Sequence, residues 1–200
     1  KGQSVFDMGN MVEGWYIEQS KKLGIWAADG VKYYDQLHNI TAKIDLFVFI
    51  DIQLYGIECK SAYGHNADKE LKEGPKVGHL MQTCLYLDFV NRTLKGSNWS
   101  SRFYIEYFMR DSCLLYEHLI ELYTADGKTW PKVNGIETRL FNLEGIYDRY
   151  SQLGVCVNLN TPPFRDFMYE YGTDDIEAMH KAGKISKSRY DAWSKGKKTI

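Results

Sequence analysis

Two carboxylates and a lysine, Asp45, Glu58 and Lys60, are the residues whose types and spacing best fit a chemical role. They border the apolar stretches of the segment ITAKIDLFVFIDIQLYGIECKSAYG. Mg²⁺ takes oxygen ligands and is usually held by one or two carboxylates together with water and substrate phosphate. Because side chains alternate faces along a strand, Glu58 and Lys60 are predicted to point the same way. The pattern therefore predicts metal-assisted attack of water on a phosphate, with an ammonium group beside the metal.

A Glu-x-Lys triplet also occurs on ordinary half-exposed strands, where both charges simply face solvent. The surroundings favour the chemical interpretation. The flanking segments are β-prone and predicted to be largely buried, and their large apolar residues are Phe47, Phe49, Ile52, Leu54 and Ile57. Charges at the margins of buried strands require partners or a function.

Four sequence blocks in order resemble motifs of the PD-(D/E)XK nuclease superfamily, most closely its branch of RecB-type and lambda-exonuclease-type enzymes. The first is similar to an opening helix that carries an acidic ligand, the second to a small-basic-apolar-Asp segment, and the third to a Glu-x-Lys strand. The fourth matches a Gln-x-x-x-Tyr helix. The blocks are Met8-Gly9-Asn10-Met11-Val12-Glu13, Thr41-Ala42-Lys43-Ile44-Asp45, Gly56-Ile57-Glu58-Cys59-Lys60-Ser61 and Gln82-Thr83-Cys84-Leu85-Tyr86. They span roughly the first half of the chain.

The resemblance implies a site that binds Mg²⁺ or Mn²⁺. Its ligands would be the carboxylates of Glu13, Asp45 and Glu58 and the backbone carbonyl of Cys59. Lys60 would be the catalytic lysine. Gln82 and Tyr86, four residues apart on one helix face, would steady Lys60 and the nucleic-acid strand. At that spacing, a Gln and a Tyr can also have a purely structural role, in which they pack at the margin of the core and their polar ends form hydrogen bonds.

The chain departs from the family pattern at two positions and offers two other candidate ligands. Ile44 stands where the superfamily has its proline, and Ala42 stands where a glycine is frequent. Glu18 is an alternative to Glu13, but five residues exceed one helical turn, so the two are not expected to face one metal. His38 is the other alternative, since imidazole suits Mn²⁺ better than Mg²⁺.

The predicted fold class is α/β: a restriction-endonuclease-like core with a central mixed β-sheet, helices on both sides and the site at one sheet edge. Helices are predicted over 7–22, 78–90 and 137–153, and strands over 26–34, 45–50, 54–61, 102–110 and 113–123. The polar segment 63–77 is predicted to be a loop, and Pro131 to interrupt the chain. We assign 1–160 to the nuclease core and 161–200 to a helical, basic appendage.

The appendage has two features that bear on function. Its aromatic residues could stack bases or bury the appendage itself, and they include Phe164, Phe167, Tyr169 and Tyr171. Its basic residues could grip phosphates or form a solvated tail, and they are Lys181, Lys184, Lys187, Arg189, Lys195, Lys197 and Lys198. Both alternatives stay open for each set.

Composition narrows the class of protein further. Apolar residues make up 44% of the 200 residues, enough for a folded core, and no stretch predicts a membrane span or a signal peptide. The four cysteines are scattered, without the clustered late set that holds an iron–sulfur cluster in some RecB-type nucleases, so no cluster is expected. The chain begins at Lys1, which indicates a piece of a longer protein. The expected location is the cytoplasm of a bacterial or phage-infected cell.

The function that these features predict is a divalent-metal-dependent deoxyribonuclease. The Gln-x-x-x-Tyr block favours an exonuclease that acts on single-stranded DNA or duplex ends in recombination, repair or phage replication. Two alternatives remain: a structure- or sequence-specific endonuclease acting on DNA or RNA, and an inactive nucleic-acid-binding module. The partner is therefore DNA, and the chain could belong to a larger replication or recombination protein.

Overall fold

The computed structural model describes residues 2–95, 98–152, 154, 156–160 and 187. The elements are α1 (Gly2–Lys22), β1 (Trp26–Asp35), β2 (Ile40–Ile50), β3 (Gln53–Ala62), α2 (His65–Glu73), α3 (Val77–Thr93), β4 (Trp99–Met109), β5 (Leu115–Ala125), β6 (Lys128–Val133), β7 (Ile136–Glu137), α4 (Leu143–Gln152) and β8 (Val157–Asn158). The aromatic and basic residues of the predicted appendage lie outside the described residues, except Lys187.

One mixed β-sheet organises the described part of the chain. Its strand order is β1-β2-β3-β4-β5-β6-β7, and β8 pairs with β2 off this path. Neighbours are antiparallel except for the β3–β4 and β2–β8 pairs, which are parallel. The predicted α/β class with a central mixed sheet flanked by helices is confirmed.

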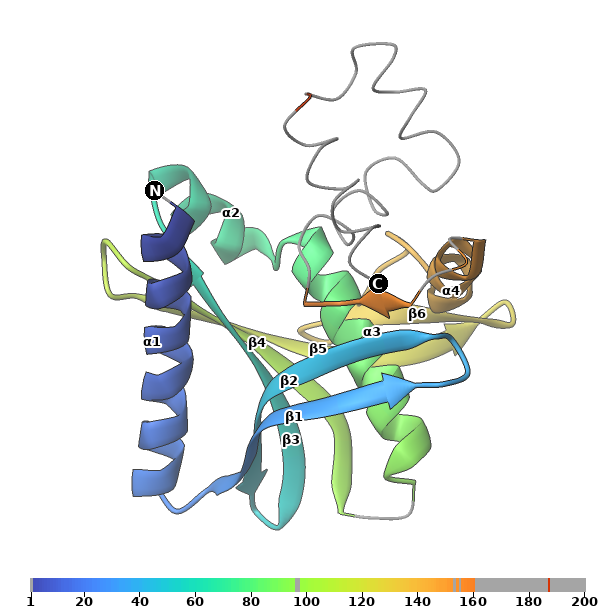
Figure 1. Ribbon diagram of the computed structural model, residues 1–200, viewed down its shortest axis with the longest axis horizontal. Coiled ribbons are helices and arrows are strands. Elements are labelled where there is room, and N and C mark those ends of the chain that lie inside the picture. Colours follow the sequence, from blue (N-terminus) through green and yellow to red (C-terminus); the bar gives the residue numbers. More distant parts are fainter. Residues whose placement is uncertain (1, 96–97, 153, 155, 161–186, 188–200) are drawn as a thin grey trace.

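Helices cover both faces of the sheet (Figure 1). On one face, Val12 and Tyr16 of α1 pack against Leu46, Val48 and Ile57 of β2 and β3. On the other face, α2, α3 and α4 contribute to a larger core whose fully buried members include Leu71, Leu85, Tyr86, Phe103, Tyr107 and Tyr150. Among the described residues, none of the helices combines the length and the apolar character needed to span a bilayer.

Three expectations about secondary structure were wrong. The predicted loop contains α2, a mostly polar helix that is oriented by the fully buried Leu71 and by Ala67, which packs against the same core. The helix predicted over 137–153 begins only at Leu143, and β7 precedes it. Pro131 lies inside β6.

Pro131 is tolerated because of where its missing N–H would point. Its carbonyl accepts the Thr138 N–H at 3.1 Å, on the side of β7. The N–H and C=O of a strand residue point to the same side, and β7 pairs only with Lys132 and Val133. Pro131 therefore leaves a gap beyond the end of the β6–β7 ladder and not within it.

The strands that carry Asp45 and Glu58 are longer than predicted, and they lie inside the sheet. β2 begins at Ile40, so Asp45 occupies its middle, and β1 is a full ten-residue strand. In the strand order, β2 and β3 are each flanked on both sides, which corrects the expectation that the site lies at a sheet edge.

Candidate active site

β2 and β3 separate part-way along their length. Their antiparallel pairing runs from Ile50↔Gln53 to Leu46↔Ile57 and then stops. Further back along β2, Ile40 and Thr41 pair with β8 instead. Because β1 already occupies the other side of β2 there, β8 must lie on the side that β3 has left. We call this point the fork, defined by Asp45 on β2 and by Glu58, Cys59 and Lys60 on β3.

The backbone of β2 is irregular at Asp45. Ile44 contacts the core on the α3 side, whereas Leu46, two residues later, contacts the core on the α1 side. Regular alternation would put both on one face, so the alternation is interrupted at the residue between them. On β1, Gly30 lies between the residues paired with Ile44 and Leu46 and has a φ of +59°, a conformation that glycine adopts without steric cost. Both strands thus depart from the regular ladder at Asp45.

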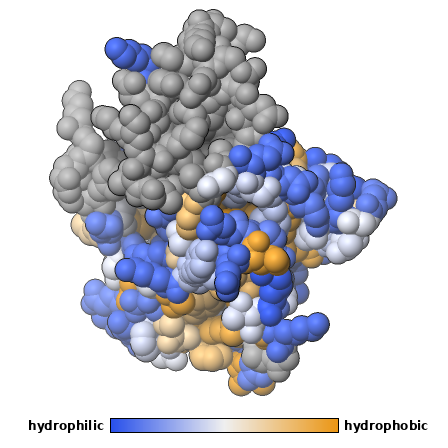
Figure 2. Space-filling model, turned by 45° about the vertical axis from the view of Figure 1, so that its right-hand side comes forward, coloured by the Kyte–Doolittle hydropathy of each residue, from blue (hydrophilic) through white to orange (hydrophobic). Residues whose placement is uncertain are grey.

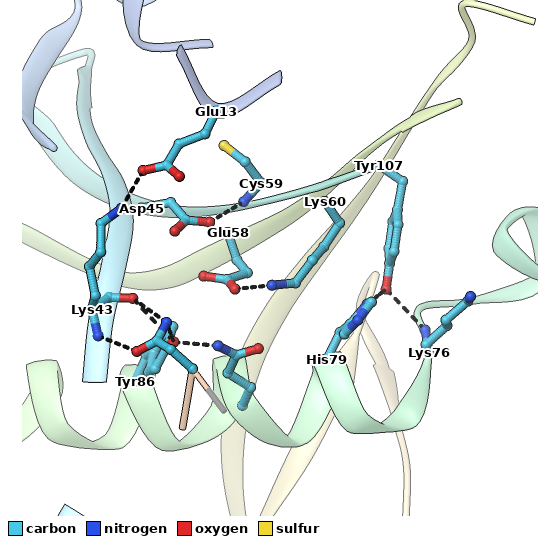
Figure 3. Close-up of polar contacts among 12 residues, drawn as sticks. Glu13, Lys43, Asp45, Glu58, Cys59, Lys60, Lys76, His79, Tyr86 and Tyr107 are labelled. Atoms are coloured by element: carbon cyan, nitrogen blue, oxygen red, sulfur yellow. Dashed lines mark hydrogen bonds and ion pairs between the residues drawn. The ribbon is translucent and has the colours of Figure 1, made fainter. Parts of the chain in front are cut away.

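Asp45 replaces a ladder hydrogen bond at the fork. Its Oδ2 accepts the backbone N–H of Cys59 at 2.9 Å, which holds the carboxylate between the two strands (Figure 3). Only 9% of the residue is exposed. Burial raises the pKa of Asp45 well above its ordinary value and the charge of Glu58 raises it further, whereas Lys60 and the Cys59 N–H act in the opposite direction. A further positive charge beside Asp45 would favour its ionised form.

Glu58 and Lys60 lie together on the α3 side of β3 and form an ion pair (Figure 3). Glu58 is 1% exposed, and the Lys60 side chain is 18% exposed. The pair uses Oε1 of Glu58. Its Oε2 is buried and has no hydrogen-bond partner among the described residues. A buried carboxylate oxygen without a donor is costly, which makes this atom the one most able to take a further ligand.

Glu13 reaches the fork from α1, but its carboxylate is bound to Lys43. The Lys43 Nζ to Glu13 Oε1 distance is 2.7 Å, and both side chains lie next to Asp45 (Figure 3). In the described part of the chain, no three His, Cys, Asp or Glu residues already form a group that could hold a metal. Asp45 and Glu58 are thus the adjacent pair of carboxylates, and a third ligand from Glu13 requires it to turn from Lys43.

Gln82 and Tyr86 are fully buried and contact each other. Tyr86 Oη donates to the Lys43 carbonyl at 3.2 Å. The structure therefore places Tyr86 against the backbone of β2 at Lys43, with Gln82 beside it. A buried Tyr ring commonly packs in a core while its hydroxyl finds a hydrogen-bond partner at the margin of that core.

Asn160, which the sequence analysis did not single out, also binds the backbone of Lys43. Its Oδ1 accepts the Lys43 N–H at 2.6 Å, and its Nδ2 donates to the Lys43 carbonyl at 3.0 Å. The Asn160 amide thus makes the two hydrogen bonds to Lys43 that a paired strand would make, just after β8 ends. No sequence pattern marks this role, because it joins positions 117 residues apart.

A pocket of about 530 Å³ opens beside Asp45. Its polar lining includes Glu13, Lys32, Lys43, Asp45, Asn158 and Asn160. Two lysines and two amides next to a buried carboxylate suit a ligand that carries both phosphate and hydrogen-bonding groups.

On the other side of Lys60 lies a second polar group, centred on Tyr107, a residue that the sequence analysis did not single out. Tyr107 is opposite Lys60 in the β3–β4 ladder, and its hydroxyl lies 2.8 Å from His79 Nδ1 (Figure 3). The same hydroxyl accepts the Lys76 N–H at 3.1 Å. Which of the two groups donates in the Tyr107–His79 hydrogen bond depends on the tautomer of His79. His79 lies on the helix face that carries Gln82 and Tyr86.

The two alternative ligands have other partners. His38 Nδ1 lies 2.8 Å from Asp35 Oδ2, and its ring stacks on Tyr147 with the ring centroids 3.6 Å apart. Glu18 pairs in solvent with Lys22 at 2.7 Å. The partners described for His38 and Glu18 lie away from the fork, whereas Glu13 pairs with Lys43 beside Asp45.

No family model matches the chain, and no curated protein or solved structure shows detectable similarity to it.

Proposed function

We propose that this protein is a divalent-metal-dependent nuclease of the PD-(D/E)XK type, with a restriction-endonuclease-like core, that hydrolyses phosphodiester bonds in DNA. The observation that carries the proposal is Glu58. Its carboxylate is almost fully buried, one oxygen is paired with Lys60, and the other has no partner among the described residues. A buried Asp45 carboxylate stands beside it. Two buried acids with one lysine fit a cation and a negatively charged substrate better than they fit a structural ion pair.

The donor set suits Mg²⁺ or Mn²⁺, which prefer oxygen ligands. Asp45 and Glu58 would hold the ion, and Glu13 and the Cys59 carbonyl are the proposed further ligands. The ion would supply electrophilic stabilisation of the scissile phosphate and a lowered pKa for the attacking water.

The residues of the chain have separate tasks in this reaction. The Lys60 ammonium, next to Glu58, orients the water and offsets the charge that grows on the phosphate oxygens. The Cys59 N–H keeps Asp45 in place without using the other carboxylate oxygen. Tyr86 and Asn160 fix the backbone at Lys43, two residues before Asp45, so that the carboxylate is preorganised.

Action on DNA ends is the favoured mode. The pocket beside Asp45 is large enough for one nucleotide, and Lys32 and Lys43 supply cations for its phosphate. A site that accepts a terminal nucleotide there would release mononucleotides. The alternatives of an endonuclease and of an inactive binding module remain as outcomes of the test.

The test compares an end-labelled linear single-stranded DNA with a closed circle of the same sequence, in Mg²⁺ or Mn²⁺. We expect loss of the linear strand alone, and no loss with Glu58→Gln, which keeps size and removes the charge. Cutting of the circle would establish an endonuclease. Survival of both substrates while the protein still binds DNA would establish the inactive module and overturn the proposal.

A further inference from the structure

We propose that Tyr63 and Arg110, at the ends of β3 and β4, form a second contact for the substrate strand, in which Tyr63 stacks on a base and Arg110 binds the adjacent phosphate. We call this pair the Tyr–Arg clamp. Tyr63 follows Lys60 by three residues, which is about 10 Å along an extended strand. That the ligand is a nucleic acid rests on the proposed function, whereas the pair by itself suits any ligand that joins a flat ring to an anion.

The ends of β3 and β4 hold the two clamp residues in place. The strands run parallel and are paired as far as Ala62. Beyond that pair, the Arg110 N–H donates to the Ala62 carbonyl at 3.0 Å. The Gly64 N–H donates to Asp111 Oδ2 at 3.1 Å. Tyr63 lies between these two hydrogen bonds, so its backbone is fixed next to Arg110 before any ligand binds.

The guanidinium of Arg110 faces an aromatic ring and not a carboxylate. Its Cζ lies 5.5 Å from the ring centroid of Tyr63. Its Nε is buried without a hydrogen-bond partner among the described residues, and Arg110 takes part in none of the ion pairs between them. The adjacent Asp111 is exposed, where solvent screens its charge, and it binds the Gly64 N–H. A phosphate can therefore bind Arg110 without breaking an ion pair within the described part of the chain.

The Tyr63 ring offers a surface for stacking, because the residue is 68% exposed although Arg110 lies over its ring. Figure 1 shows α2, which begins two residues after Tyr63, toward the upper end of the molecule. Figure 2 keeps the same vertical direction. On the face that it views, hydrophilic side chains cover most of the upper described surface, and hydrophobic ones are more frequent below. The Tyr–Arg clamp thus lies at a polar end, where an exposed ring can stack on any base of a charged strand.

The experiment measures binding of the full chain to two fluorescent single strands of equal length, oligothymidylate and an abasic strand with the same phosphates. EDTA prevents cleavage, and the salt concentration is varied. The test variants are Tyr63→Leu and Arg110→Gln. The matched controls are Trp26→Leu, an exposed aromatic of β1 with Lys21 over its ring, and Arg102→Gln, an ion-paired arginine of β4. Thermal unfolding of each variant checks the fold.

We expect Tyr63→Leu to bind oligothymidylate about tenfold more weakly, because one stacked base is lost, and to bind the abasic strand as wild type does. Arg110→Gln should bind both strands about fivefold more weakly at about 0.1 M salt. Its salt dependence should fall by about 0.7 log units per log unit of salt, which is the contribution of one phosphate contact on a single strand. The two controls should retain wild-type binding.

Three results would overturn the inference. Wild-type binding of oligothymidylate by both test variants would remove the Tyr–Arg clamp, while cleavage of linear DNA by the same chain in Mg²⁺ would leave the nuclease proposal intact. An equal loss of affinity for both strands in Tyr63→Leu would show that the ring does not act on a base. If the wild-type chain binds no oligothymidylate and cleaves no DNA, the proposed function fails together with this inference.

Discussion

The Asp45 carboxylate accepts the Cys59 backbone N–H at 2.9 Å at the position where β2 and β3 separate. The Asp45 side chain thus replaces a backbone acceptor of the β2–β3 ladder, so the two strands separate without leaving the Cys59 N–H unpaired. The same hydrogen bond holds the buried Asp45 carboxylate beside Glu58. Two neighbouring buried negative charges repel each other, and a cation between them would offset that repulsion. The hydrogen bond therefore joins the two strands and, in the proposed function, also positions Asp45 as a metal ligand.

Asp45→Asn should separate these two roles. The asparagine Oδ1 can still accept the Cys59 N–H, so we expect the metal-free variant to be at least as stable as wild type. Ligand binding at 100 times its dissociation constant raises the free energy of unfolding by about 2.7 kcal/mol, and this gain should disappear in the variant. Thermal unfolding with and without Mn²⁺ measures it. Asp51→Asn, in the exposed hairpin turn, is the charge-matched control; equal metal stabilisation of Asp45→Asn and wild type would exclude Asp45 as a ligand.

Lys60→Met should destabilise the metal-free protein as well as abolish cleavage. The Glu58 carboxylate is 1% exposed and its ion-pair partner is lost, and breaking a buried pair costs about 3–5 kcal/mol. The double variant Glu58→Gln/Lys60→Met should regain most of this stability, because no unpaired charge remains. Urea unfolding of the two single variants and the double variant forms a cycle. Additive effects would show that the two side chains do not interact.

Glu106 should make stability depend on pH. Burial, with a smaller contribution from the charge of Glu117, raises the pKa of its carboxyl to about 7 from an ordinary 4.5, although Tyr16 acts in the opposite direction. A carboxyl with a raised folded pKa favours folding most below about pH 4.5, and this contribution is lost as the pH rises to about 7. Glu106→Gln should therefore match wild type at pH 4 and exceed its stability at pH 8 by at most about 3 kcal/mol.

Chemical denaturation of the metal-free protein across this pH range checks the prediction. Glu70→Gln, an exposed carboxylate on α2, serves as the control for loss of one charge. A Glu106→Gln variant with the same pH profile as wild type would place the titration elsewhere.

Ile52→Gly should stabilise the protein. Asp51 and Ile52 form the turn between β2 and β3 with φ values of +47° and +64°, and the Ile52 side chain is exposed. A left-handed conformation costs a non-glycine residue about 1–2 kcal/mol, and an Asp-Gly pair suits such a hairpin turn. We expect a gain of about 1 kcal/mol in the free energy of unfolding. Ile52→Ala, which keeps the strain and removes most of the apolar side chain, should show no such gain.

The sequence by itself determined the local parts of the candidate site. Alternation along β3 indicated that Glu58 and Lys60 share a face, and the four-residue spacing of Gln82 and Tyr86 predicted their contact. Both patterns are fixed by the periods of strand and helix, which tertiary packing does not change. The α/β class followed from the same periodicity.

The tertiary structure decided what depends on contacts between distant segments. The fork exists because β8, more than 100 residues after β2, takes the place that β3 leaves, and Asn160 then pairs with Lys43. The ion pair between Glu13 and Lys43 and the placement of Tyr107 opposite Lys60 likewise join separate elements. A polar side chain carries no local signal of a partner far along the chain. For this reason the sequence named the residues of the fork, but only the packing showed which of them are bound and which buried oxygen has no donor among the described residues.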